Sequence, residues 1–481
     1  MAQIKDKVVG GLLWKFSERI STQGVTFVLQ IILARLLLPE EYGLIAMINV
    51  FIALANIFVT SGFSTSLIQK KDADDLDFST ILWSSLAVSV FLYVILYFAA
   101  PFIASFYEMP QLVPVTRIYS ISLLFLAYNS IQQAYVSRKM LFRKMFYSTL
   151  FGSILSGIIG IVFAYLNFGI WSLVSQYTLN IIFNIIILQC IIDWKAKLVF
   201  SWNRAKKLMK YGSNILGAAF VGQLFEELRQ LLIGKYYTAA DLAYFNRGRA
   251  LPTLISSNIE ASINQVMFPA MSDYSDKPLE IKNMVRRSIQ VSSFVMYFFM
   301  TLLAVASRPI IILLLTEKWA PAVPYMQMIC ISSMIAIMST ANMQAIKAIG
   351  RSDIVLKLEF WKKPAFLIIL FCAVQHSVYA VALTMPIYSL YAAIVNMWPN
   401  KKLLNYSIVE QFRDQMPAVL LAGVSAVVSY PLFYLDVNQY LIMILQIATC
   451  SILYFGLSYI FRVETYEYLI RSVRNFIMNR K

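Results

Sequence analysis

The sequence predicts an all-helical polytopic membrane protein with about fourteen transmembrane helices in two pseudo-symmetric, parallel lobes and with both termini in the cytoplasm. Three observations support this fold class: an apolar composition, basic residues in alternate connections, and an internal repeat. Of the 481 residues, 59% are hydrophobic and only 14% are charged. A soluble protein of ordinary composition carries about 25% charged residues.

Apolar segments follow one another along almost the whole chain, and each is long enough to span a membrane. The expected helices are 10–38, 41–66, 79–103, 111–137, 145–167, 169–192, 208–234, 241–268, 283–306, 321–347, 354–375, 377–398, 415–436 and 438–461. The first apolar run is interrupted by Lys15, Glu18 and Arg19 and continues to Leu38, so we expect a spanning helix there and not a cleaved signal peptide. A shorter run at 308–317 is expected to be re-entrant or interfacial.

Basic residues gather in alternate connections between these segments. One cluster comprises Arg138, Lys139, Arg143 and Lys144, and a second lies within 195–210. The intervening connections, such as 167–169 and 436–439, are short and nearly uncharged. Basic loops stay on the cytoplasmic side, so this distribution places both termini inside. It also explains the formal net charge of +16 without any nucleic-acid partner.

A shift of 200 residues aligns the first two expected helices with the seventh and eighth. It places Gln23 on Gln223 and Gln30 on Gln230. Both copies start inside, as in transporters whose substrate site lies between two parallel repeats. The expected organisation is an N-lobe at 1–192, a cytoplasmic linker at 193–207, a C-lobe at 208–398, two additional helices within 399–461 and a cytoplasmic amphipathic tail at 462–481. The tail is expected to lie on the inner leaflet, with packing on cytoplasmic loops as the alternative.

Polar side chains recur at helical spacing on several of these helices. The first carries Lys15, Arg19, Thr22, Thr26 and Gln30 on one face. The seventh and eighth carry comparable stripes, and Arg117 adds a charge to the fourth. One arginine at the centre of a membrane helix costs about 2.5–3.5 kcal/mol on insertion scales. The stripes therefore predict a polar, net positive cavity, with internal ion pairs and snorkelling as the alternatives.

Arg247 and Arg249 lie two positions apart on the eighth expected helix, about 200° around its axis. The stripe assigns Arg249 to the cavity and Arg247 to a neighbouring helix or another part of the wall. A guanidinium suits phosphate because it offers planar, bidentate donors and a charge that does not titrate. Tyr244 and Tyr119 are aromatic side chains available for stacking on a ligand. The residues expected to contact substrate are Arg249, Arg247, Arg229, Arg117, Arg19, Lys15, Gln30, Gln223, Gln230 and Asn246.

Four carboxylates are candidates for a coupling charge if H⁺ or Na⁺ drives transport. They are Glu18, Glu226, Glu227 and Glu260. No catalytic residue, metal site or organic cofactor is predicted, because the only histidine is His376 and no two of the four cysteines have metal-ligand spacing.

Four segments carry a family resemblance: LARLLLPEEYG at 33–43, SGFSTSLIQKK at 61–71, AYFNRGRALPTL at 243–254 and FPAMSDYSD at 268–276. With them the chain resembles the polysaccharide transporter family of the MOP superfamily, which includes Wzx-type O-antigen and exopolysaccharide flippases and colanic-acid-exporter-like proteins. The resemblance runs along nearly the whole chain. Arg247 lies within a matching segment, whereas the other candidate cations rest on the stripes.

This resemblance implies a MATE-like fold of fourteen helices in the bacterial inner (cytoplasmic) membrane. It implies alternating-access transfer of an undecaprenyl-diphosphate-linked oligosaccharide from the cytoplasmic to the outer leaflet, with the diphosphate in a cationic cavity. The implied partners are this lipid-linked substrate, membrane lipid, and a polysaccharide polymerase or assembly proteins.

Two other functions are alternatives for a polytopic membrane protein of this kind. A MATE-like cation or drug antiporter shares the fold but needs a cavity biased towards carboxylates. A polysaccharide polymerase or ligase would need a large outer loop with catalytic residues, and no expected outer loop exceeds about a dozen residues unless 307–320 is counted.

Overall fold

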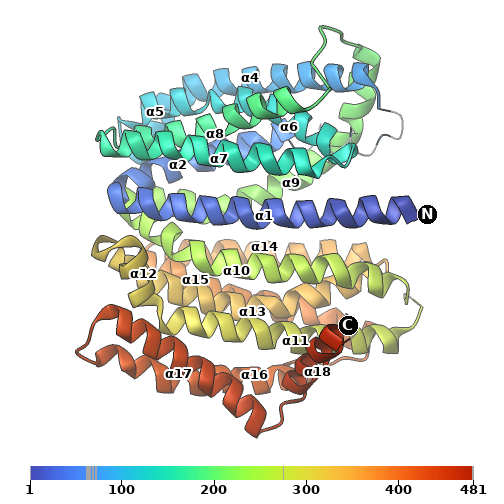
Figure 1. Ribbon diagram of the computed structural model, residues 1–481, viewed down its shortest axis with the longest axis vertical. Helices are drawn as coiled ribbons and strands as arrows, with labels where there is room; N and C mark the ends of the chain where they lie inside the picture. Colours follow the sequence, from blue (N-terminus) through green and yellow to red (C-terminus); the bar gives the residue numbers. More distant parts are fainter. Residues whose placement is uncertain (1, 61–66, 68–69, 71–72, 275, 479–481) are drawn as a thin grey trace. The chain divides into compact units, whose positions relative to one another are not determined.

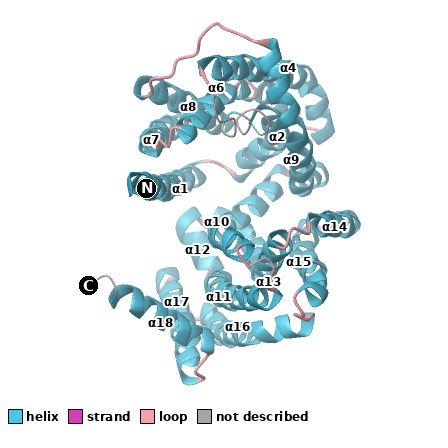
Figure 2. Cartoon of the chain, turned by 90° about the vertical axis from the view of Figure 1, so that its right-hand side faces the viewer, coloured by secondary structure: helices cyan, strands magenta, loops and turns pink. Residues whose placement is uncertain are grey.

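The computed structural model describes residues 2–60, 67, 70, 73–274 and 276–478, and all the regular structure among them is helical (Figures 1 and 2). Most of the SGFSTSLIQKK segment, Ser275 of FPAMSDYSD and the last three residues of the tail lie outside the described residues. Chain contacts divide the protein into two units, Met1–Ala243 and Tyr244–Lys481.

The first unit contains α1 (Ala2–Leu36), α2 (Pro39–Thr60), α4 (Asp75–Tyr107), α5 (Leu112–Tyr119), α6 (Ser122–Arg138), α7 (Phe142–Tyr165), α8 (Ile170–Ile191) and α9 (Trp202–Tyr236). Helix α10 (Ala239–Ser272) starts in the first unit and continues into the second. The second unit then contains α11 (Pro278–Val305), α12 (Ser307–Leu315), η1 (Glu317–Ala322), α13 (Val323–Ala348), α14 (Ser352–Ala373), α15 (Val378–Leu403), α16 (Ile408–Ser429), η2 (Tyr430–Tyr434), α17 (Gln439–Ile460) and α18 (Glu464–Met478).

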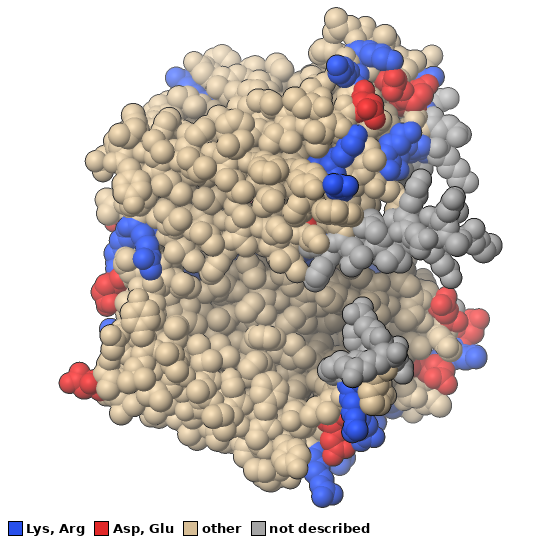
Figure 3. Space-filling view, viewed as in Figure 1, with Lys and Arg blue, Asp and Glu red and all other residues tan. Residues whose placement is uncertain are grey.

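Every expected helix has a counterpart in the structure. Ten helical segments among the described residues are long and apolar enough to cross a membrane. Four further long helices, α1, α9, α10 and α14, correspond to expected spans but carry more charge. The 308–317 run forms the short helix α12. Figure 3 agrees with a membrane protein, because charged side chains on the visible face lie mainly near the helix ends.

The boundary between the units differs from the lobe boundary expected at 193–207. Helix α9 packs on α2 and α4, so the contact division assigns it to the first unit. The expected lobes were defined by the sequence repeat, whereas the two units are defined by contacts between residues. The division into lobes therefore stays a prediction.

The 200-residue repeat continues into the backbone structure. Helix α1 ends at Leu36 and α2 begins at Pro39, while α9 ends at Tyr236 and α10 begins at Ala239. An acidic side chain caps the second helix of each pair. Glu41 Oε2 accepts from the Leu38 amide at 2.7 Å, and Asp241 Oδ2 accepts from the Thr238 amide at 3.2 Å. A carboxylate at a helix N-terminus satisfies free amides and interacts favourably with the helix dipole.

The linker after α8 and the first turn of α9 are fixed to the N-terminus of α4 by ion pairs. Arg204 Nη1 lies 2.6 Å from Asp74 Oδ1, and Lys197 Nζ lies 2.6 Å from Asp75 Oδ2. Asp77 is fully buried and pairs with Lys70 at 2.6 Å. Asp74 and Asp77 also form a reciprocal capping box on α4. These contacts explain why the chain leading into α9 belongs with the first unit.

The Asp74–Arg204 pair should add an acid-dependent contribution to stability. The hydrogen bond from Arg204 lowers the pKa of the Asp74 carboxyl to about 2, from its usual value of 3.8. Because the folded pKa is the lower one, this contribution is present above about pH 4 and is lost as pH falls towards 2. Between pH 4 and pH 2, the unfolding temperature of Asp74→Ala should therefore fall by less than the unfolding temperature of the wild type. Equal falls in the two proteins would contradict the pairing.

A chain of buried amides joins α13, α15 and α16 in the second unit. Asn400 Nδ2 donates to Asn342 Oδ1 at 2.6 Å, and Asn342 Nδ2 donates to Gln411 Oε1 at 2.8 Å. Gln411 Nε2 in turn donates to the Tyr406 carbonyl at 3.3 Å. All three amide side chains are buried. Polar side chains can join helices in this way where lipid offers no hydrogen-bond partners.

Candidate functional site

Part of the polar stripe of α1 contacts α7 or pairs within α1, and part of it lies to the side of the α7 contact. Lys15 Nζ lies 2.9 Å from Glu18 Oε2, and Thr22 Oγ1 donates to Thr149 of α7 at 3.3 Å. On a helix, Arg19 and Gln30 point in nearly the same direction, about a quarter turn from Leu29. Leu29 faces α7, because its side chain fills the space beside Gly157. The half-buried Arg19 and Gln30 therefore lie away from the centre of the α7 contact.

On α9 the two predicted glutamines bind one carboxylate. Glu227 accepts from Gln223 Nε2 at 2.7 Å and from Gln230 Nε2 at 2.6 Å. Glu226 is exposed, and Arg229 is half-buried. The structure thus brings Gln223, Glu227 and Gln230 together as one hydrogen-bonded group, in which both carboxylate oxygens of Glu227 accept.

Arg117 contacts α4. Its Nε donates to the Tyr97 carbonyl at 3.3 Å, and its Cζ lies 4.3 Å from the centre of the Tyr97 ring. These contacts position the guanidinium by a hydrogen bond and a cation–π interaction. The expectation that Tyr119 could stack on a sugar is wrong, because Tyr119 is buried and donates to Asn49 Oδ1 at 2.9 Å.

On α10 the two arginines flank a glycine that packs tightly on η1 and α13. A Cβ on Gly248 would lie 2.7 Å from the Ala322 carbonyl oxygen and 2.8 Å from the Met326 nitrogen. Arg247 and Arg249 lie about 100° to either side of this contact. Arg247 Cζ is 5.8 Å from the Trp319 ring centre, and Tyr244 packs edge-on against the same ring at 6.0 Å. Arg249 is half-buried and makes no hydrogen bond, ion pair or ring contact among the described residues.

The remaining predicted residues on α10 are Asn246 and Glu260, both half-buried. The predicted substrate residues thus divide between the units. Lys15, Arg19, Gln30, Arg117, Gln223, Arg229 and Gln230 belong to the first, and Asn246, Arg247 and Arg249 belong to the second. Their common role in one cavity, and the choice between Arg247 and Arg249, stay predictions.

Sequence reasoning missed an ion pair on α14 in which the lysine is buried and the glutamate is partly exposed. Lys362 is buried, and its Nζ lies 2.6 Å from Glu359 Oε1. From Lys362 to the end of α14 at Ala373 the helix rises about 16 Å, roughly half the hydrocarbon thickness of a bilayer. The signal was present as opposite charges three residues apart inside an expected span. Ionisable side chains at such a depth usually serve a function.

Comparison with known proteins decides the family. Residues 32–324 match the family described as Polysaccharide biosynthesis protein. The chain belongs to this family. Relatives among known proteins also match most of the chain. One is the teichuronic acid biosynthesis protein TuaB of Bacillus subtilis, 24% identical over 89% of this chain and 90% of its own length. Another is the succinoglycan biosynthesis transport protein ExoT of Rhizobium meliloti, 21% identical over 72% of this chain and 70% of its own length.

Solved structures confirm the fold of this family member. The inward closed conformation of the lipid II flippase MurJ has a TM-score of 0.75 at 15% identity, and covers 95% of this chain and 100% of its own. An inward-facing multidrug resistance MATE transporter of the MOP superfamily has a TM-score of 0.59 at 14% identity, and the match covers 80% of this chain and 94% of the transporter. The predicted MATE-like fold class and family are confirmed, and the chain is a multi-pass protein of the bacterial inner membrane.

Proposed function

We propose that this protein is a flippase that moves an oligosaccharide linked to a lipid diphosphate from the cytoplasmic to the outer leaflet by alternating access. Its relatives are named for polysaccharides as different as teichuronic acid and succinoglycan. The pathways that make these polysaccharides would share a lipid-linked precursor. A shared precursor fits a flippase better than an enzyme that is specific for one polysaccharide. The protein itself would then catalyse no covalent step.

The observation that carries the proposal is the placement of two arginines, Arg247 and Arg249, within the long helix α10. Two of the four candidate carboxylates, by contrast, are partly neutralised or already hydrogen-bonded. Glu18 pairs with Lys15, and Glu227 accepts from two glutamines. Such a set favours an anionic ligand, because guanidinium groups can bind phosphate oxygens bidentately. A MATE-like cation antiporter would need the opposite balance.

Coupling to H⁺ or Na⁺ is part of the proposal. Among the described residues, Glu226 and Glu260 are the candidate carboxylates with neither an ion pair nor a hydrogen bond, and both are at least partly accessible. The lipid chain would remain in the bilayer while the diphosphate and sugars cross. A polysaccharide polymerase or assembly protein would receive the product at the outer face.

Transfer of a fluorescent lipid-diphosphate oligosaccharide across proteoliposomes tests the proposal. We expect Arg249→Ala to reduce the rate at least tenfold, since loss of a charge-assisted contact of about 1.4 kcal/mol gives that factor. Arg249→Lys should recover part of the rate. Arg351→Ala is the matched control, because Arg351 is exposed and pairs with Asp353 at 2.8 Å near the start of α14.

Two outcomes would change the proposal. If only Arg247→Ala loses activity, Arg247 and not Arg249 is the substrate contact. If the wild type transfers no lipid-linked sugar but moves drug cations, the protein is an antiporter.

A further inference from the structure

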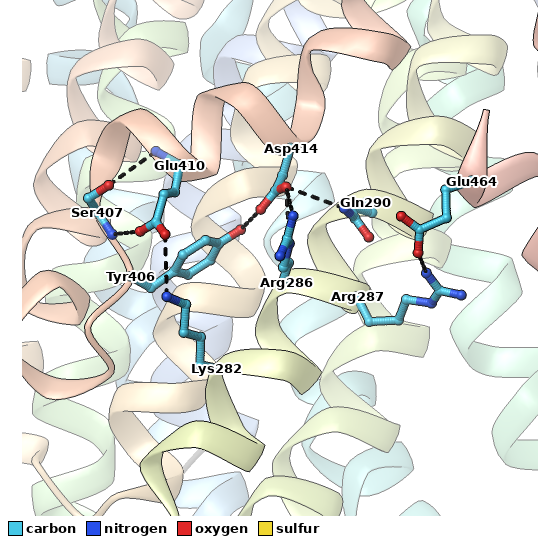
Figure 4. Close-up of polar contacts among 9 residues, drawn as sticks. All are labelled: Lys282, Arg286, Arg287, Gln290, Tyr406, Ser407, Glu410, Asp414 and Glu464. Carbon is cyan, nitrogen blue, oxygen red and sulfur yellow. Dashed lines mark hydrogen bonds and ion pairs between the residues drawn. The ribbon is translucent and has the colours of Figure 1, made fainter. Parts of the chain in front are cut away.

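The C-terminal helix α18 is fixed to the second unit through its first turns. Tyr466 packs against Phe294 of α11 and Phe455 of α17, with ring centres 6.3 Å apart in both cases. Arg287 Nη1 lies 3.0 Å from Glu464 Oε1, as Figure 4 shows. The Arg287 guanidinium also lies 3.5 Å from the Tyr468 ring centre. An ion pair and aromatic packing therefore hold the N-terminal half of α18 on membrane-spanning helices.

Between α18 and these helices lies an apolar groove of about 500 Å³. This volume is within the usual range for ligand pockets, about 300–1,000 Å³. The groove opens outwards, because Phe455, Ile470 and Met478 are 38%, 48% and 55% exposed. Its lining residues are Phe294, Phe455, Tyr466, Leu469, Ile470, Arg474 and Met478.

Arg474 is the charged member of this lining, and it makes no ion pair among the residues that the structure describes. The other arginine of the described part of α18, Arg471, donates to Glu467 Oε2 at 2.8 Å and does not line the groove. The two side chains point about 60° apart on the helix. A cation at the rim of an apolar groove complements a ligand with a hydrocarbon chain and an anionic head.

We propose that this groove binds an acyl chain of an anionic phospholipid whose phosphate is held by Arg474. The walls formed by α11 and α17 are membrane-spanning, so bilayer lipid reaches the groove without crossing water. Amphipathic helices bind bilayers through buried apolar area and attraction to anionic lipids. Bound lipid would fill the space under α18 and hold this helix on the second unit. The proposal is independent of which substrate the protein carries.

Native mass spectrometry of the full chain in nanodiscs tests the site. The discs contain equal amounts of dioleoyl phosphatidylglycerol and dioleoyl phosphatidylcholine, which differ in head-group charge and not in chains. We expect the wild type to retain phosphatidylglycerol preferentially and Arg474→Gln to lose that preference by about fivefold. Arg471→Gln, the matched control, should keep it. Ile470→Gln should lower the retention of both lipids, because Ile470 lines the apolar part.

Four results would overturn the proposal. Equal losses in Arg471→Gln and Arg474→Gln would indicate diffuse attraction to the basic helix. Undiminished preference in Arg474→Gln would show that the phosphate binds elsewhere. Stabilisation of α18 by soluble glycerol 3-phosphate alone, measured as resistance of the tail to trypsin, would show that the groove needs no acyl chain. Dimers that form in the wild type and disappear in Ile470→Gln would make a second copy of the chain the occupant.

Discussion

Asp77→Ala should lower the stability of the first unit by about 3 kcal/mol. The Asp77 side chain is fully buried, and Oδ2 accepts from Lys70 at 2.6 Å. Arg204 Nη1 lies 3.2 Å from Oδ1 without hydrogen-bond geometry, so it acts mainly through its charge. Removing one partner of a buried pair costs about 3–5 kcal/mol. Lys70 and Arg204 are 36% and 35% exposed, so water relieves part of the cost and the lower end applies.

Asp75→Ala is the matched control, because Asp75 lies two positions away on the same helix turn but is 55% exposed. Its pair with Lys197 should contribute less than about 1 kcal/mol. Thermal unfolding of the protein in detergent compares the two variants. For a unit of this size we expect the midpoint to fall by about 6–12 °C in Asp77→Ala and by less than about 4 °C in Asp75→Ala. Equal falls would mean that burial of Asp77 does not determine its contribution.

The helices were predictable because each follows from a local apolar segment, but hydropathy alone misplaced some of their starts. Helix α4 begins at Asp75 and not at 79, and α16 begins at Ile408 and not at 415. Both starts carry a capping box, Asp74 with Asp77 and Ser407 with Glu410. This pattern of a capping side chain three residues before an acid is visible in the sequence. Reading it together with hydropathy would have corrected both starts.

The candidate site was less predictable, because helical spacing shows which side chains share a face but not which of them pair. The stripe on α9 was correctly placed on one helix. Only the structure shows that Glu227 accepts hydrogen bonds from both Gln223 and Gln230. The partner of Tyr119 is Asn49, 70 positions away, and no local pattern connects them. Arg117 likewise contacts Tyr97 across a turn between two helices. Such partners depend on tertiary packing.

Gly43→Ala is the second substitution for which we expect a large effect. A Cβ on Gly43 of α2 would lie 1.8 Å from the carbonyl oxygen and 2.3 Å from the carbonyl carbon of Ala239. These are backbone atoms at the start of α10, so relief requires that one helix moves relative to the other. We expect a loss of about 3 kcal/mol, the upper end for overpacking. This contact gives a physical reason for the glycine that ends the LARLLLPEEYG segment.

Gly423→Ala is the control, because nothing lies within 4 Å of a Cβ at Gly423 in α16. There the methyl group should raise stability by about 0.8–1 kcal/mol, since alanine is the better helix former. Gly43→Ala should also slow lipid-linked sugar transfer per folded molecule. Arg247 and Arg249 follow Ala239 by eight and ten residues, about 12–15 Å along α10, so a displaced helix start moves both guanidinium groups. If Gly43→Ala unfolds and transfers lipid-linked sugar as the wild type does, then α2 and α10 do not meet at this contact. In that case the turn before α2 and the turn before α10 pack differently from the arrangement described above.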